Sequence, residues 1–300
     1  MYSTRDWTDL PLLPSIANRL GLIELLRFRA VCKDWFAASS VASAEIESVP
    51  DHEPWFLFYD DDNSLCTLVT KSFSKKYTID LPELKGTKCL ASCEGWLLLF
   101  CEGSMFFFCP LSRAKIDIPG TFPHTVISNH VAILSAPPTS EDCVVGVISR
   151  TKTEVKFHAF RRGATSWTEH NLKSKYPKRI RYAAYHKRGF YFFDNTNLMV
   201  YYSIGQPELR LAEARYVKPE TDEEGIIFRL DNEEETNQMN ELKERLALED
   251  MSQVSICGTI VSCDNARINK MVPYENNRVL QKQGAWFQPR FHQISENQSW

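Results

Sequence analysis

Long hydrophobic runs are missing from this sequence of 300 residues. The apolar runs at residues 96–100 and 105–109 are five residues each, whereas a helix that crosses a membrane needs roughly 20. The first residues, MYSTRDWTDLP, have no apolar core of the length that a secretory signal uses. We therefore expect no membrane partner and a location in the cytoplasm, the nucleus or both.

An excess of one charge and a metal-binding cysteine pattern are also missing. The net charge of −3 does not favour nucleic acid or an acidic surface as the main partner. The nine cysteines form no paired CxxC elements, since Cys89 and Cys93 are four apart and Cys257 and Cys263 six apart, and the seven histidines are scattered. We expect buried, reduced thiols and no metal site.

Catalytic signatures are equally scarce. The chain has no GxSxG elbow, no HExxH motif and no phosphate-binding glycine loop, and 12 glycines are few for such loops. The DDDN run at residues 60–63 resembles the start of a calcium loop, but Cys66 and Ser72 stand where such a loop has glycine and glutamate. It is better interpreted as a hairpin turn. We expect no catalytic residue and no cofactor.

The amino-terminal stretch at residues 7–35 predicts three short helices in about 40 residues. Pro14 suits the first turn of a helix, Ile16 and Leu20 share a face, and Gly21 ends it. Further along, apolar residues recur at steps of three and four and are predicted to lie on one side of a helix or helix pair: Leu25, Phe28, Val31, Cys32 and Trp35. So small a unit needs a partner surface, which can be the rest of its own chain or another protein.

The stretch ESVPDHEP, at residues 47–54, predicts a linker into a region of another class. Beyond it, short aromatic and β-branched runs alternate with turns, which is typical of an all-β domain. The runs are WFLFY, LCTLV, YTIDL, GWLLLF, MFFFC and AKIDI. We assign residues 7–43 to the helices, 44–54 to the linker and 55–300 to the β domain.

The β domain contains an internal repeat. Trp55 and Trp96 open corresponding runs 41 residues apart, and IDLP at residues 79–82 recurs as IDIP at 116–119. A shift of 94 residues, two units of 47, carries GWLLL onto GFYFF and MFFFC onto MVYYS, and DCVVGVIS, EVKFHAF and SWTEH fill the unit between them. Such a unit is typical of a propeller blade, and roughly five blades would fit. A β-sandwich with similar hairpins is the alternative.

Two stretches have lopsided charge. Residues 220–250 hold twelve acidic residues against three basic ones, which predicts a solvated acidic insertion or an acidic docking surface. Residues 173–188 hold seven Lys and Arg residues and no acidic one, interleaved with tyrosines. RNA binding or nuclear import could use such a segment, but alternating strand residues give the same pattern, and nucleic acid is not favoured. The aromatic tail at residues 284–300 is expected to pack on the β domain and pair with a strand near the linker.

The order LP, Ile16, Leu20, then LRFRAVCKDW at residues 26–35 resembles the F-box in the form common among plant F-box proteins. In that family the helices bind the Skp-type adaptor of a cullin-based ubiquitin ligase. The resemblance implies an adaptor-facing or supporting apolar surface made of Leu10, Pro11, Ile16, Leu20, Leu25, Val31, Cys32 and Trp35. About two residues fewer than usual separate LP from Ile16, so the first helix should be short.

The β domain is similar to the carboxy-terminal domain of KIB-type and kelch-like plant F-box proteins. The shared elements are GWLLLF, PLSRAKIDIP at residues 110–119 and SWTEH. Cys109 stands where Asn is usual in that family, and Arg113 where a small residue or glycine is common.

These resemblances imply an α+β multidomain protein, with a three-helix F-box followed by an all-β, propeller-like domain. The function they imply is a non-catalytic substrate receptor of an SCF-type (Skp, cullin, F-box) ubiquitin ligase. Its partners would be a Skp-type adaptor, a cullin through that adaptor, and an unknown protein substrate. Two alternatives remain: a stand-alone binding protein whose helices only cap the β domain, and an enzyme or RNA binder that uses a funnel on that domain.

Overall fold

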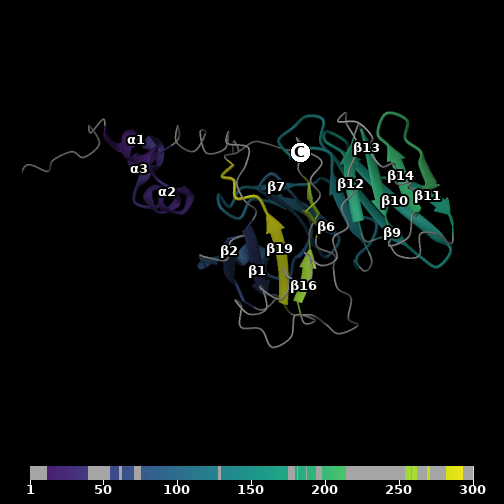
Figure 1. Cartoon of the computed structure of the whole chain (residues 1–300), viewed down its shortest axis with the longest axis horizontal. Helices are drawn as coiled ribbons and strands as arrows, with labels where there is room; N and C mark the ends of the chain where they lie inside the picture. Colours follow the sequence, from purple (N-terminus) through teal and green to yellow (C-terminus); the bar gives the residue numbers. More distant parts are fainter. Residues whose placement is uncertain are drawn as a thin grey trace, which may run out of the picture.

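A computed structural model of the chain has three helices followed by a large β domain (Figure 1). It describes residues 12–39, 55–60, 63–70, 76–127, 130–174, 180, 182–186, 188–193, 198–213, 254–257, 259–261, 269–270, 282–292 and 300. The helices are α1 (Leu12–Ala17), α2 (Leu22–Arg29) and α3 (Lys33–Ala38). None of the helices in these ranges has the length and apolarity that a bilayer crossing requires.

The strands of the described part form four sheets. The first has the order β16-β19-β1-β2-β3 and contains β1 (Trp55–Asp60), β2 (Leu65–Thr70), β3 (Lys76–Asp80), β16 (Val254–Cys257) and β19 (Lys282–Phe287). The second has the order β18-β17-β4-β5-β6-β7 and contains β4 (Lys88–Cys93), β5 (Trp96–Cys101), β6 (Ser104–Phe108), β7 (Lys115–Asp117), β17 (Thr259–Val261) and β18 (Asn269–Lys270). The short 3-10 helix η2 (Pro82–Leu84) connects the first sheet to the second.

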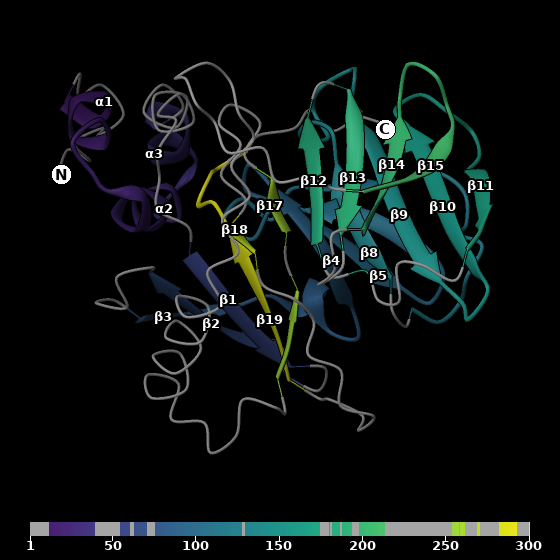
Figure 2. The same ribbon diagram turned by 45° about the vertical axis from the view of Figure 1, so that its right-hand side comes forward.

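The other two sheets each consist of four strands that follow one another in the chain. The third has the order β11-β10-β9-β8 and contains β8 (Val131–Leu134), β9 (Val144–Arg150), β10 (Glu154–Arg161) and β11 (Thr168–Lys173). The fourth has the order β12-β13-β14-β15 and contains β12 (Tyr182–His186), β13 (Gly189–Phe193), β14 (Leu198–Ser203) and β15 (Leu209–Glu213). Figure 2 shows the fourth sheet beside the third, with the first sheet on the side of the helices.

The sequence repeat corresponds to equivalent strands. GWLLLF forms β5 and GFYFF forms β13, the second of the four consecutive strands in their sheets, and the next run of each forms β6 and β14. Trp55 and Trp96 also open equivalent strands, because β19 takes the place before β1 that β4 takes before β5. The predicted class, three helices followed by a propeller-like β domain, is confirmed. The number of five blades stays a prediction.

The carboxy-terminal segment completes the first sheet. β19 pairs antiparallel with β1, from Trp55 opposite Phe287 to Asp60 opposite Lys282. The expected pairing between the tail and a strand near the linker is therefore confirmed. Two strands that lie more than 220 residues apart in the chain become neighbours.

The core is built from alternating apolar residues of these strands. One buried cluster joins the second, third and fourth sheets and includes Trp96, Phe107, Phe157 and Trp300. A second cluster joins the first two sheets and includes Leu57, Phe108 and Phe287. Five of the described cysteines are buried, as expected: Cys66, Cys89, Cys93, Cys109 and Cys143. Burial raises the pKa of the Cys66 thiol to about 12.

The predicted turn at residues 60–63 lies between β1 and β2, and its residues 61 and 62 lie outside the described residues. β1 and β2 pair antiparallel, and the Asn63 Oδ1 accepts a hydrogen bond from the backbone N–H of Leu65 at 3.0 Å. The linker at 44–54 and the acidic insertion at 220–250 lie outside the described residues. Within the basic stretch, Lys173 ends β11 and Arg188 precedes β13, and both are exposed.

Candidate functional site

The three helices build a small core of their own. Leu13 and Ala17 from α1 and Leu25 and Phe28 from α2 are buried together, and Leu20, Trp35 and Ala38 pack against them. The rings of Phe28 and Trp35 lie 4.3 Å apart between centroids. Few apolar side chains are enclosed, as expected for a unit of this size.

Large apolar side chains remain exposed on the same helices. Leu12 is 57% exposed, Ile16 45%, Val31 59% and Phe36 46%. They lie on α1, on the turn between α2 and α3, and on α3, and α1 contacts α3. Only three other large apolar side chains in the described part are exposed: Leu65, Val126 and Leu211. We call Leu12, Ile16, Val31 and Phe36 the exposed apolar set.

The predicted adaptor-facing residues divide into three groups. Ile16, Val31 and Cys32 are exposed, Leu20 and Trp35 are partly buried in the helical core, and Leu25 is 1% exposed inside it. Leu25 and the two partly buried residues can support the surface from within. Leu10 and Pro11 lie outside the described residues.

The sequence predicted that the apolar residues from Leu25 to Trp35 lie on one side of a helix or helix pair, and this prediction is wrong. α2 ends at Arg29, and Cys32 has extended backbone, with φ −164° and ψ 173°, before α3 begins at Lys33. This break turns Val31 outward while Leu25 and Phe28 stay inside. Leu12 and Phe36 were missed, although the i, i+4 spacing of Leu12 and Ile16 was a signal that could have identified the first.

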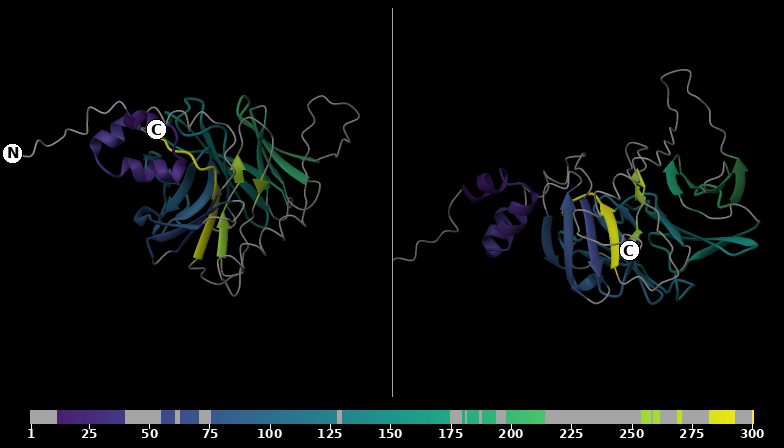
Figure 3. Two further views of the ribbon diagram at one scale, coloured as in Figure 1. Left: turned by 60° about the vertical axis from the view of Figure 1, so that its left-hand side comes forward. Right: turned by 60° about the horizontal axis from the view of Figure 1, so that its bottom comes forward.

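One side of α2 faces the β domain. Leu22 and Leu26, four residues apart, pack against the apolar cluster shared by the first two sheets. Both views of Figure 3 show the helices beside the first sheet and away from the fourth. The helical unit therefore has a side covered by its own chain and apolar residues that are left exposed.

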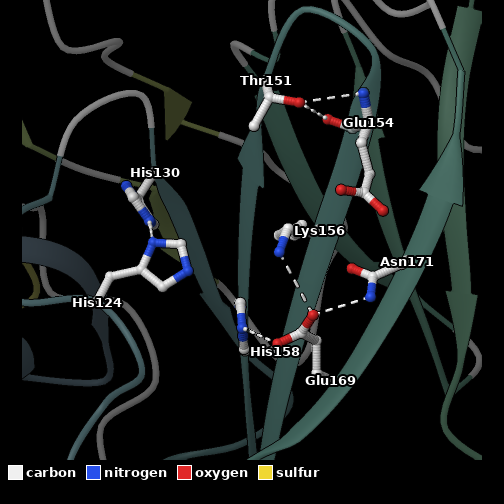
Figure 4. Close-up of polar contacts among 8 residues, drawn as sticks. All are labelled: His124, His130, Thr151, Glu154, Lys156, His158, Glu169 and Asn171. Atoms are coloured by element: carbon white, nitrogen blue, oxygen red, sulfur yellow. Dashed lines mark hydrogen bonds and ion pairs between the residues drawn. The ribbon is translucent and has the colours of Figure 1, made fainter.

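A second group of residues surrounds Phe122, in the segment between β7 and β8. His124 Nδ1 and His130 Nε2 lie 3.1 Å apart, and His158 on β10 has its ring centroid 5.1 Å from that of His124 (Figure 4). The Phe122 ring contacts all three imidazoles and Trp167. Sequence reasoning found the histidines scattered, because only the pairing of distant strands brings them together.

His158 and Glu169 form the polar contact beside this group. The side chain of His158 is completely buried, and its Nε2 donates to Glu169 Oε2 at 3.3 Å, while Asn171 Nδ2 donates to Glu169 Oε1 at 2.8 Å (Figure 4). Burial lowers the pKa of the His158 imidazole, and the Glu169 charge opposes this in part. The hydrogen bond from Asn171 is the main cause that lowers the pKa of the Glu169 carboxyl.

This arrangement is that of a packed polar cluster. Within the described ranges, no three His, Cys, Asp or Glu side chains are arranged so that they could hold a metal ion. Thr151, at the turn between β9 and β10, exchanges hydrogen bonds with the backbone of Glu154 and caps that turn. The exposed apolar set on the helices is therefore the better candidate for a functional surface.

The third and fourth sheets are four-stranded and antiparallel, and the first and second each contain four antiparallel strands in the same arrangement, β19-β1-β2-β3 and β4-β5-β6-β7. This repetition, with the carboxy-terminal strand completing the first sheet, defines a protein of the β-propeller class. The sequence pattern of the family described as KIB1-4 beta-propeller matches residues 45–277. The chain belongs to this family. The predicted resemblance to plant F-box proteins with a KIB-type or kelch-like domain is confirmed.

Curated relatives from Arabidopsis thaliana are F-box proteins by name. An F-box/kelch-repeat protein is 33% identical over 177 residues, which cover 57% of this chain and 48% of the relative. Two further F-box proteins are 32% identical over 169 residues and 30% identical over 200 residues, covering 54% and 62% of this chain. The aligned parts are 41% and 40% of those relatives, so the chain spans less than half their length.

Proposed function

We propose that this chain is the substrate-recognition subunit of an SCF-type ubiquitin ligase. In this proposal α1, α3 and the turn before α3 bind a Skp-type adaptor and, through it, a cullin. The β domain binds a target protein and holds it near the ubiquitin-loaded enzyme, so that transfer is accelerated by proximity without a catalytic residue of this chain. We place this activity in the cytoplasm, the nucleus or both.

The single observation that carries the proposal is the exposed apolar set. Exposed apolar side chains are ordinary when scattered, but a concentration of them on one small unit is typical of a protein interface. Four of the seven exposed large apolar residues in the described part belong to the helices. The F-box names of the relatives supply the class of partner.

The test is binding of a purified plant Skp-type adaptor to the full chain, measured by calorimetry. Val31→Asp places a charge in the proposed interface, and we expect affinity to fall by roughly tenfold or more. Val126→Asp is the matched control, since Val126 is 74% exposed on the β domain and Val31 is 59% exposed on the turn between α2 and α3. Both variants should keep the wild-type unfolding midpoint. An adaptor that binds the Val31 variant as tightly as the wild type would contradict the proposed surface.

A second candidate function is a stand-alone binding protein whose helices cap the β domain. The packing of Leu22 and Leu26 on the cluster of the first two sheets favours it. This candidate predicts no adaptor binding by the wild-type chain, with helices that remain folded on the β domain. The same calorimetric experiment therefore separates the two.

A further inference from the structure

Arg29, the last residue of α2, is almost fully enclosed. It is 6% exposed, and its guanidinium carbon lies 4.1 Å from the ring centroid of Phe36 and 4.0 Å from that of Phe291. Arginine is seldom buried unless its charge is compensated, and a cation over an aromatic ring is attracted more strongly when both are removed from water. The two rings come from different parts of the molecule: Phe36 from α3 and Phe291 from the segment after β19.

Arg29 continues the covered face of α2. Leu22, Leu26 and Arg29 follow at i, i+4 and i+7, which places them on one side of a helix. The two leucines pack on the same apolar cluster to which Phe291 belongs. In Figures 1 and 2, the segment that follows β19 runs toward the helices. α2 therefore contacts the β domain along its length, and Arg29 provides the contact at its carboxyl end.

Phe291 is itself held in place on the second sheet. Its neighbour Arg290 forms an ion pair with Glu94, Nη1 to Oε2, at 3.1 Å, and His292 Nε2 donates to the Glu94 backbone carbonyl at 2.6 Å. The His292 ring stacks on Trp96 with centroids 5.0 Å apart. These contacts fix the segment at the turn between β4 and β5.

The turn between β4 and β5 allows this close approach because it contains glycine. Gly95 has φ +86°, and a Cβ added there would lie 2.7 Å from the Arg290 Cβ. Any other residue would push the segment away or strain the turn. Phe291 is therefore presented to Arg29 from a position defined by the sheet.

We propose that Arg29 is a positioning residue that locks the helical unit to the β domain in one orientation. Its guanidinium joins Phe36, a member of the exposed apolar set, to Phe291 of the β domain. A partner bound on the helices and a target bound on the β domain are then held at a constant relative orientation. The role of this lock in ubiquitin transfer rests on the proposed function, whereas the lock itself does not.

The first experiment compares Arg29→Lys with Arg27→Lys in the full chain. Both substitutions keep the charge and lie on the same helix, but Arg27 is exposed, and lysine lacks the planar group that stacks between two rings. Hydrogen exchange of the α2 amides and the distance distribution between dyes at the exposed positions of Asp34 and Lys152 are measured. We expect Arg29→Lys to raise exchange by about tenfold and broaden the distribution, and Arg27→Lys to change neither.

The second experiment uses Phe291→Leu, which changes the β-domain side and leaves the exposed apolar set intact. The distance distribution should broaden as for Arg29→Lys, while adaptor affinity stays within about twofold of wild type. Unchanged exchange and distances in both the Arg29 and Phe291 variants would overturn the proposal. If the wild-type chain binds no adaptor, the proposed function fails, and the free-chain measurements still decide whether the lock exists.

Discussion

The helices and the β domain differ in how completely they bury their apolar side chains. In the β domain, strands such as β5 and β9 are buried over nearly their whole length. The helical unit buries Leu13, Ala17, Leu25 and Phe28 and leaves the exposed apolar set outside. The difference follows from size, because a unit of this length cannot enclose all of its apolar surface.

As a consequence, the amino-acid composition points to a binding surface on the helices but not on the β domain. Large apolar side chains that remain exposed on so small a unit are typical of a binding surface, and they can be recognised from composition. In the β domain the apolar residues are used for the core, so under the proposed function target choice would depend on loop side chains, whose composition names no partner. The contact through Arg29 is where the two regions meet.

The largest effect should come from truncating one core residue in each region. Phe157 on β10 is fully buried, with its ring centroid 4.2 Å from that of Tyr202, and Phe157→Ala should lower the free energy of unfolding of the β domain by about 3–5 kcal/mol. Leu25→Ala should raise hydrogen exchange in α1–α3 and leave the sheets protected, because Leu25 belongs to the separate helical core. Equal loss of protection in both regions from either variant would show a single cooperative unit.

Low pH should destabilise the β domain and not the helices, and this effect should be smaller than that of the core substitutions. Burial lowers the pKa values of His158, His170 and His292, all in the β domain, while residues 12–39 contain no histidine. Below the ordinary pKa of about 6.5 the unfolded chain binds protons that the folded domain does not. The three histidines therefore do not reduce the free energy of unfolding of the β domain above pH 6.5. Below pH 6.5 this free energy falls as the pH drops through the lowered pKa values.

The measurement for this pH dependence is the urea midpoint of the full chain at pH 7.5, 6.5 and 5.5. His158→Gln should flatten the dependence, since it removes one of the three histidines whose pKa is lowered by burial. Histidine-free α1–α3 should keep their hydrogen exchange protection, after correction for the intrinsic rate, over the same range. A midpoint that does not change with pH would contradict the prediction.

The smallest effect concerns Arg113, at the position where the resemblance to KIB-type and kelch-like plant proteins implies a small residue or glycine. Arg113 has φ +60°, a left-handed backbone that costs a residue with a side chain roughly 1 kcal/mol. Its ion pair with Glu83 is largely exposed and offsets part of that cost. Arg113→Gly should be more stable than Arg113→Ala by about 1 kcal/mol in chemical denaturation, because both lose the ion pair and only glycine relieves the backbone. A reversed order would contradict this account.

Strand positions in the β domain could be predicted well because they depend on local alternation and on a repeat. The 94-residue shift identified β5 with β13 and β6 with β14, and the tail was expected to pair near the linker, as β19 does with β1. Aromatic runs of this kind are buried wherever the sheets stack, so tertiary context supports the local pattern instead of overriding it.

The features that were missed depend on the path of the chain between elements. A helical period projected through residues 30–32 placed Val31 with Leu25, but the extended backbone at Cys32 separates them. Arg29 was interpreted only as part of a motif, although its spacing from Leu22 and Leu26 indicated a shared face. His124 and His158 come together because the segment between β7 and β8 contacts β10, and no local pattern contains that contact.

The pairing of β19 with β1 also has a consequence for synthesis of the protein. β1 leaves the ribosome more than 220 residues before the strand that completes its sheet, so one edge of β1 lacks that partner for most of translation. Unpaired edges are templates for association with other chains. Truncated products that end before Lys282 would keep this edge open, which makes them candidates for aggregation and for quality control.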